Sequence, residues 1–386
     1  MTLTPAPDLH HNVAPAAWPC VDASLNLLPS TEERDFREAL RALLDSQGDI
    51  ESVRTLTSGT PGYSIPLWSE LTQSMAVTSV AADEEAGGEG FGTTFLAAAL
   101  EECGRALRPE PVLGSATVGT VALALGSTKD TEDWQRAALT GALIVSSSRL
   151  TAATDRIDAV CDGGTWAVHG AAYPVTSAAA ADVFIVTAAT GDGRGLYAVS
   201  AADARVRTHD SIDPTRPVAT VRFDAAPAQL LTESAGEIAM LHTRLRLALS
   251  AELVGIAERL LELTREYTLS RRQFGRQIAS FQAVKHRLAD MLLNVERARS
   301  LTRYATVHFD HDRDTGALPA AAAAAMAMDA AHDIASETIQ LHGGIGFTWE
   351  HPAHSYYRRV LANEGAYGSA SEHRAAVARI LVPASG

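Results

Sequence analysis

From about residue 233 to the C-terminus, apolar residues recur every three or four positions, which is the spacing that places them on one face of an α-helix. Leu241, Leu245 and Ala248 follow Ile238 in this way, and the same spacing continues beyond Leu253. A polar turn at residues 311–316 separates this stretch from an Ala-rich segment. Helical periodicity over so many residues predicts a bundle of long helices at residues 233–386.

Residues 136–232 have a different texture. Short runs of β-branched and apolar residues alternate with turns rich in Gly and Asp, as at residues 162–164 and 191–193. The runs lie at residues 165–170, 183–188, 195–199 and 218–223. This pattern predicts an antiparallel β-sheet domain.

Residues 31–135 are mostly helical in pattern, beginning with the capping sequence Ser30–Glu33. Residues 1–30, rich in Pro and Ala, are predicted to be an N-terminal extension. The chain therefore divides into an extension, a helical domain (31–135), a sheet domain (136–232) and a helical domain (233–386). Helices and strands segregated in this way belong to the α+β class.

Composition excludes several functions. The chain has a net charge of -14 and no block of Lys and Arg, so neither nucleic acid nor an anionic membrane is an expected partner. No secretory signal or apolar run long enough for a bilayer is present, and a cytoplasmic location is expected. Cys20, Cys103 and Cys161 lack metal-ligand spacing, so free thiols and no metal site are predicted.

Two motifs in the last domain carry the functional signal. The first is Arg271–Gly275, followed by Phe281–Met291, and the second is Gln340–Phe347. Their order and spacing resemble the C-terminal domain of the acyl-CoA dehydrogenase family, and both are expected within a long helical region. Weaker matches at residues 83–92, 101–107, 211–216 and 354–359 extend the resemblance to nearly the whole chain from Thr31.

This resemblance implies a fold, a reaction and a cofactor. The family has an N-terminal helical domain, a central β domain and a C-terminal four-helix domain, and it desaturates acyl-CoA thioesters at Cα–Cβ. FAD accepts the hydride, while protein groups bind and orient it. Arg residues suit its pyrophosphate, and Gly residues allow backbone to approach a ligand closely. The residues matched to FAD contacts are Arg271, Gln273, Phe274, Gln282, Gln340, Gly343 and Gly344.

The catalytic base is harder to find. Family members carry the Glu that acts as the catalytic base at one of two positions, and these positions fall here on Tyr367 and Leu245. A phenol with a pKa near ~10 is a poor base. Glu252, two helical turns beyond Leu245, is the candidate replacement, because burial would raise its pKa. The competing interpretation is a structural Glu bonded to a neighbouring helix. Glu364 and Glu372 are weaker candidates.

The segments that would line this chain's own flavin ring are also altered. The stretch at residues 142–154 lacks the Gly, Pro and acid of the family pattern, and residues 173–177 match only loosely. The residues matched to the FAD of a neighbouring subunit are thus intact, whereas those that would line this chain's own flavin ring and substrate are altered. This combination resembles the actinobacterial heteromeric branch of the family, which acts on steroid side-chain thioesters.

We therefore expect a subunit of a heterotetrameric acyl-CoA dehydrogenase, with a partner subunit that carries the base. The other expected partners are an acyl-CoA substrate and an electron-transfer flavoprotein. Two alternatives stay open. One is a self-sufficient homotetramer that uses Glu252, and the other is a flavin-free relative with a binding or non-redox role.

Overall fold

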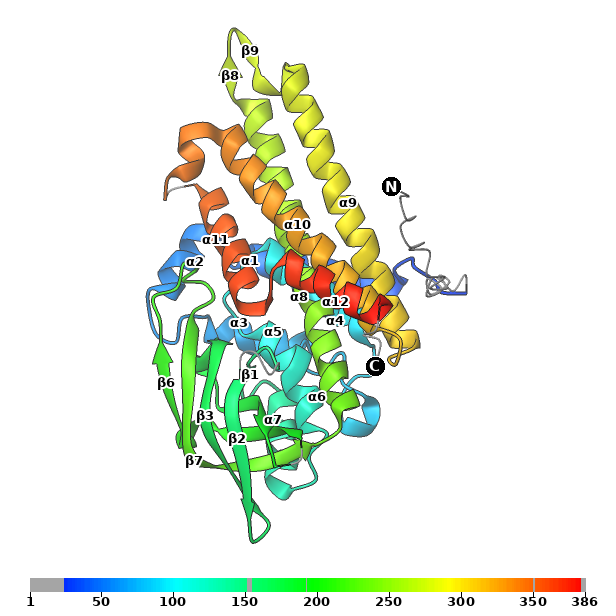
Figure 1. Ribbon diagram of the computed structural model, residues 1–386. Coiled ribbons are helices and arrows are strands. Elements are labelled where there is room, and N and C mark those ends of the chain that lie inside the picture. Colours follow the sequence, from blue (N-terminus) through cyan, green and yellow to red (C-terminus); the bar gives the residue numbers. More distant parts are fainter. Residues whose placement is uncertain (1–23, 151–154, 192, 350, 383–386) are drawn as a thin grey trace, which may run out of the picture.

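The computed structural model describes residues 24–150, 155–191, 193–349 and 351–382 (Figure 1). Its first part is helical, as predicted. Ser30 caps the first helix by accepting a hydrogen bond from the Glu33 backbone N–H, and a capping box at Thr128 begins the last one. The helices are α1 (Thr31–Ser46), α2 (Ile50–Thr57), α3 (Ile65–Ser69), α4 (Thr93–Arg105), α5 (Val112–Gly114), α6 (Thr120–Leu123) and α7 (Lys129–Leu139).

A seven-stranded sheet follows. The strands are β1 (Val145–Ser147), β2 (Asp155–Asp162), β3 (Thr165–Thr176), β4 (Val183–Ala189), β5 (Arg194–Ser200), β6 (Ala204–Thr208) and β7 (Val218–Thr232). Their order is β1-β4-β2-β3-β7-β5, with β6 paired to β7. The sheet is mostly antiparallel, as predicted, but β1 and β2 pair with β4 in parallel. Neither β1 nor β2 is joined to β4 by a hairpin, because other strands lie between them along the chain, and this permits parallel pairing.

The remaining chain forms long helices that rise above the sheet (Figure 1). They are α8 (Ala235–Ser270), α9 (Gln282–His311), α10 (Ala317–His342), α11 (Pro352–Tyr367) and α12 (Ala370–Leu381). The motif at Arg271 was predicted to lie within a long helical region, but it forms a hairpin of β8 (Arg272–Gln273) and β9 (Arg276–Gln277) between two helices. Phe274 and Gly275, between the two strands, have φ of +50° and +78°, left-handed values that make the tight turn of the hairpin.

The type of secondary structure changes twice along the chain. The first strand begins at Val145, a few residues after α7 ends at Leu139, and α8 begins at Ala235, directly after β7 ends at Thr232. These changes lie near the predicted boundaries at residues 135 and 232. The boundaries themselves stay a prediction, because a domain is defined by independent packing rather than by element type.

The helices share one large core. Helix α8 crosses α4 so closely that a Cβ added at Gly255 would lie 1.8 Å from the Glu101 carbonyl oxygen. Only Gly fits such a crossing. A second cluster of apolar side chains, including Phe184, Tyr197 and Phe223, fills the interior of the sheet domain. Within the described residues, no helix is both long enough and apolar enough to cross a bilayer.

Candidate functional site

The β8–β9 hairpin presents the first predicted group of FAD contacts to solvent. Arg271, Gln273 and Phe274 are all exposed, and Phe274 is 91% exposed. The side chain of Arg271 has no hydrogen bond or ion pair with the rest of the described chain. Neighbouring contacts stiffen the hairpin, because the Arg276 guanidinium lies 4.0 Å over the ring of Phe281. The hairpin thus offers a free cation and an apolar side chain to something outside this subunit.

The second group lies at the same end of the helical bundle (Figure 1). Tyr267, near the end of α8, stacks on His342, the last residue of α10, with 4.3 Å between ring centroids. This contact fixes the start of the hairpin beside the Gly343–Gly344 turn. Both glycines are exposed, and a Cβ at either would meet nothing within 4 Å. Their backbone is therefore open to a ligand arriving from outside.

Gln340 lines a cavity of about 480 Å³ next to this turn. Aromatic side chains form much of its wall, and Trp349, 63% exposed, is covered on one face by the Arg358 guanidinium at 4.7 Å. The cavity lining consists of Ile212, Ser336, Ile339, Gln340, Phe347, Trp349, His354, Tyr357, Arg358 and Leu361. Gln282, at the start of α9, is also exposed. All seven predicted contacts thus face solvent, and their donors and glycines fit the phosphates and adenosine of an FAD held mainly elsewhere.

The side of the chain that would face its own flavin is closed. Tyr367, predicted to occupy a usual base position, is buried, and its hydroxyl lies 2.7 Å from the Thr176 hydroxyl in the segment loosely matched to the flavin side. Burial raises the pKa of Tyr367 above its ordinary value. The carbonyl of Thr176 in turn accepts a hydrogen bond of 2.6 Å from Ser146. A phenol and a threonine in direct contact leave no room between them for a flavin ring and a thioester, so these residues do not fit the cofactor.

Leu245, at the second base position, is a core residue of α8. The altered flavin-side stretch is described as far as Leu150. Its last predicted positions, Thr151–Thr154, lie outside the described residues.

Glu252 is 2% exposed and completely paired. The Arg216 guanidinium donates to its two carboxylate oxygens at 2.6 Å and 2.5 Å, and Arg359 donates at 2.9 Å. The Asn363 amide adds a hydrogen bond of 3.1 Å. Asp213 accepts from Arg359 at 2.5 Å, so two guanidiniums face two carboxylates and the cluster is neutral.

The pKa rise predicted for Glu252 is therefore wrong. Burial alone would raise this pKa, but attraction to Arg216 and Arg359 outweighs burial and leaves it below the ordinary value of 4.5. A carboxylate with both oxygens occupied by cations is a weak proton acceptor. The geometry favours the competing interpretation of a structural Glu. Its partners come from the neighbouring helix α11, as that interpretation predicted, and also from Arg216 in the loop before β7.

Glu364 and Glu372 have ordinary surface roles. Glu364 lies on α11, about 4.0 Å from His332. Glu372 pairs with Arg149 at 3.2 Å and completes the capping box of α12 with Ser369.

Sequence reasoning did not connect Arg216, Arg359 and Asn363 with Glu252. Each lies inside or beside a motif already matched to the family, but they are 36, 107 and 111 positions from Glu252 along the chain. The available signal was Glu252 itself, the one charge in the apolar stretch at residues 247–257 of α8. It indicates burial of a charge, and a buried charge requires a partner.

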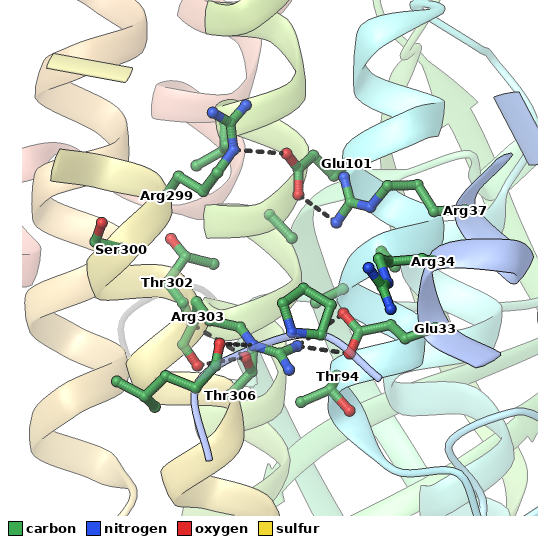
Figure 2. Close-up of a pocket in the computed structure, with 16 residues that line it drawn as sticks. Glu33, Arg34, Arg37, Thr94, Glu101, Arg299, Ser300, Thr302, Arg303 and Thr306 are labelled. Carbon is green, nitrogen blue, oxygen red and sulfur yellow. Dashed lines mark hydrogen bonds and ion pairs between the residues drawn. The ribbon is translucent and has the colours of Figure 1, made fainter. Parts of the chain in front are cut away.

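A cavity of about 410 Å³ between α1, α4, α8 and α9 is separate from these groups (Figure 2). Small residues such as Ala97, Ala98 and Ala251 line it, and most of its charged residues form ion pairs. Arg37 and Arg299 contact Glu101 at 2.8 Å and 3.2 Å, while Arg303 contacts Glu33 at 2.7 Å. Arg34, in the same lining, has no ion pair within the described chain and donates to the Ser30 carbonyl and the Thr31 hydroxyl instead.

No group of three or more potential metal ligands occurs in the part of the chain that the structure describes. Cys103 is a buried free thiol and Cys161 an exposed one, whereas Cys20 lies outside the described residues.

Comparison with known proteins adds independent support. Residues 239–382 match the family described as "Acyl-CoA dehydrogenase, C-terminal domain". The chain is 32% identical to acyl-CoA dehydrogenase IpdE2 of Mycolicibacterium smegmatis over 335 residues, covering 86% of this chain and 93% of that protein. Acyl-CoA dehydrogenase FadE27 of Mycobacterium tuberculosis is 29% identical over 90% of this chain and 96% of its own length.

Chains from two solved complexes have the same fold as this chain. The ChsE4-ChsE5 complex from Mycobacterium tuberculosis gives a TM-score of 0.85 at 27% identity, over 94% of this chain and 100% of that chain. A variant of the Tcur3481-Tcur3483 steroid acyl-CoA dehydrogenase gives 0.82 at 28% identity, over 90% and 97%. The expected fold and the resemblance to the steroid branch are confirmed. This chain belongs to the acyl-CoA dehydrogenase family, the FAD-dependent oxidoreductases that desaturate acyl-CoA thioesters.

Proposed function

We propose that this chain is one subunit of a heteromeric acyl-CoA dehydrogenase and that it completes the FAD site of a partner subunit. In this proposal the partner holds the flavin ring and the acyl-CoA and supplies the catalytic base. The observation that carries it is the contrast between two sites. The outward site is exposed and unpaired at Arg271, whereas the inward site is closed by the contact between Tyr367 and Thr176.

Each outward residue has a definable task. The Arg271 guanidinium would bind a phosphate of the cofactor, and Phe274 would cover the site and exclude water. Gln340 would donate to the adenosine end, and Gly343 and Gly344 would let it approach the backbone. When bound, FAD supplies the acceptor for the substrate hydride. The α-proton would go to a carboxylate of the partner, since no unpaired buried carboxylate lies beside Tyr367 in the described chain.

Similarity to a steroid acyl-CoA dehydrogenase complex supports a bulky, steroid-like acyl chain as the substrate. An electron-transfer flavoprotein is the proposed acceptor of the electrons, and the proposed location is the cytoplasm. These three points follow from the family and its steroid branch, and the chain's own residues do not select them.

The test is the visible spectrum of the protein, purified alone and after co-expression with an acyl-CoA dehydrogenase encoded beside it. We expect a colourless lone chain and a yellow complex with a flavin band near about 450 nm and one FAD per pair of unlike subunits. Bleaching by an acyl-CoA in the complex would then report turnover.

The alternatives give different results. A yellow lone chain that an acyl-CoA bleaches would establish the homotetramer with its own base and reject the shared site. A chain that stays colourless even in a stable complex would establish the flavin-free relative. In the first case, loss of bleaching in Glu252→Gln with FAD retained would identify Glu252 as the base.

A further inference from the structure

The outer face of the sheet carries an arginine row, which we define as Arg156, Arg205 and Arg222. Strand pairing aligns them, because Arg156 on β2 is opposite Ala171 on β3, Ala171 is opposite Arg222 on β7, and Arg222 is opposite Arg205 on β6. Directly paired residues project to the same face of a sheet. The three side chains therefore leave the same surface side by side.

The opposite face of these strands is the packed interior. Ile157, Val221 and Phe223, which alternate with the arginines along β2 and β7, are buried in the core of the sheet domain. The arginines themselves are exposed. The row thus lies on the face of the sheet opposite its packed interior, on strands β2, β6 and β7, which are seen in the lower left of Figure 1, below the helical bundle.

None of the three guanidiniums has a partner among the described residues, either as a hydrogen bond or as an ion pair. This is unusual in a chain of net charge -14, in which carboxylates outnumber cations. Arg205 and Arg222 are also directly opposite each other, about 5 Å apart at the backbone. Like charges in that position destabilise a sheet, so the row costs stability in the free protein.

The row surrounds a hollow of about 650 Å³. Gly170 and Ala171, with no side chain and a methyl group, form its floor between the longer arginines. Tyr173, 51% exposed, stands at the rim, where its edge contacts His209 at 5.5 Å between ring centroids. Asp224 is the acidic residue in the lining, and it leaves the balance of charge positive.

We propose that this hollow binds a nucleotide carrying two phosphate groups. Adjacent Arg205 and Arg222 would hold one phosphate with parallel N–H donors, and Arg156, about 10 Å from Arg222 across β3, would hold the other. The exposed ring of Tyr173 offers a surface for the base. Asp224 can accept a hydrogen bond from a sugar hydroxyl. The site is distinct from the FAD contacts at the end of the bundle and does not depend on the proposed function.

The test is calorimetric titration of the full-length chain with ADP, pyrophosphate and inorganic phosphate at low and high salt. We expect saturable one-site binding of ADP, weaker binding of pyrophosphate, still weaker binding of phosphate, and loss of affinity with salt. Arg222→Ala and Arg205→Ala should each weaken ADP binding by about tenfold or more. Arg136→Ala, an exposed arginine of α7 paired with Asp133, is the matched control and should leave binding unchanged.

Thermal unfolding separates binding from a structural role. Without ligand, Arg222→Ala should melt no lower than the wild type, because it removes the repulsion from Arg205. A lower melting temperature would mean that the row stabilises the sheet and would overturn the proposal. Absence of ADP binding, or equal loss in Arg136→Ala, would also overturn it. So would an Arg222→Glu variant that binds ADP normally but no longer assembles with its partner subunit, since the row would then be a protein contact.

Discussion

Two guanidinium groups contact the carboxylate of Glu252, and this arrangement decides the chemistry of the residue. Ion pairs with Arg216 and Arg359 offset the desolvation of the buried Glu252 carboxylate, and Asp213 neutralises the second cation. A neutral cluster of this kind gives less stability than its short distances suggest, but removing a single member leaves a buried charge uncompensated.

Replacing Glu252 with Gln should therefore lower the free energy of unfolding by about 3–5 kcal/mol. Urea unfolding of the lone chain measures this. Glu364→Gln, at an exposed pair with His332, is the control and should change stability by no more than about 0.5 kcal/mol. An unchanged stability for Glu252→Gln would show that the cluster is not structural.

The residue His373 should make stability depend on pH. It is 4% exposed, and burial, together with the charges of Arg246 and Arg149, lowers its pKa from 6.5 to about 4. The folded state thus keeps His373 neutral while the unfolded state protonates, so its contribution is complete above pH 6.5 and is lost as pH falls toward 4.

In His373→Gln, the slope of unfolding free energy against pH between 6.5 and 4 should fall by up to about 1.4 kcal/mol per pH unit, the value for one proton. Denaturant unfolding at several pH values measures the slope. His332→Gln, at a half-exposed position, is the control. An identical slope in the wild type and His373→Gln would show that this imidazole does not titrate with folding.

At the scale of elements, the crossing of α4 and α8 depends on Gly255. Gly255→Ala would press a methyl group against the Glu101 carbonyl, so we expect a loss of about 1–3 kcal/mol as the helices move apart. Gly365→Ala on α11 is the matched control. It is exposed with no atom within 4 Å of an added Cβ, and should stabilise by about 0.5–1 kcal/mol. Equal effects at the two positions would contradict the close packing.

The β8–β9 hairpin is the element on which the shared cofactor site depends. Arg271→Ala should leave the stability of the lone chain unchanged, because this side chain has no described partner. In the complex with the partner subunit it should weaken FAD retention by about tenfold or more. Flavin released per complex after dialysis measures this, with Arg265→Ala, an exposed residue of α8, as the control. Full retention in Arg271→Ala would exclude the hairpin from the site.

At the scale of the whole molecule, the end of the helical bundle that carries the β8–β9 hairpin exposes large apolar side chains. Phe274, Phe347 and Trp349 are all exposed there, and clustered apolar exposure of this kind marks an interaction site. Assembly with the partner subunit should bury Trp349 and shift its fluorescence to shorter wavelength. The shift should disappear in Trp349→Phe, which removes that one indole and leaves the other tryptophans as an internal control. An emission spectrum unchanged by assembly would place the interface elsewhere.

Helical and strand periodicity, together with the motif spacing, predicted most of the fold and the outward site. The helices of residues 233–386, the strands near residues 165 and 218, and the α+β class were all readable, because burial on one face imposes a local repeat. The hairpin at Arg271 was not, since its left-handed turn is set by Phe274 and Gly275 over too few residues to produce a period.

By itself, the sequence identified the family and led to the prediction that both usual base positions lack a Glu, because residue identity and spacing are local properties of the chain. Only the tertiary structure decided what surrounds Glu252 and Tyr367. Glu252 meets Arg216 from the segment before β7 and Arg359 from α11, and Tyr367 meets Thr176 across 191 positions. Such partners set the pKa of a carboxylate and the space available to a flavin, and they come together only when the helices pack on the sheet.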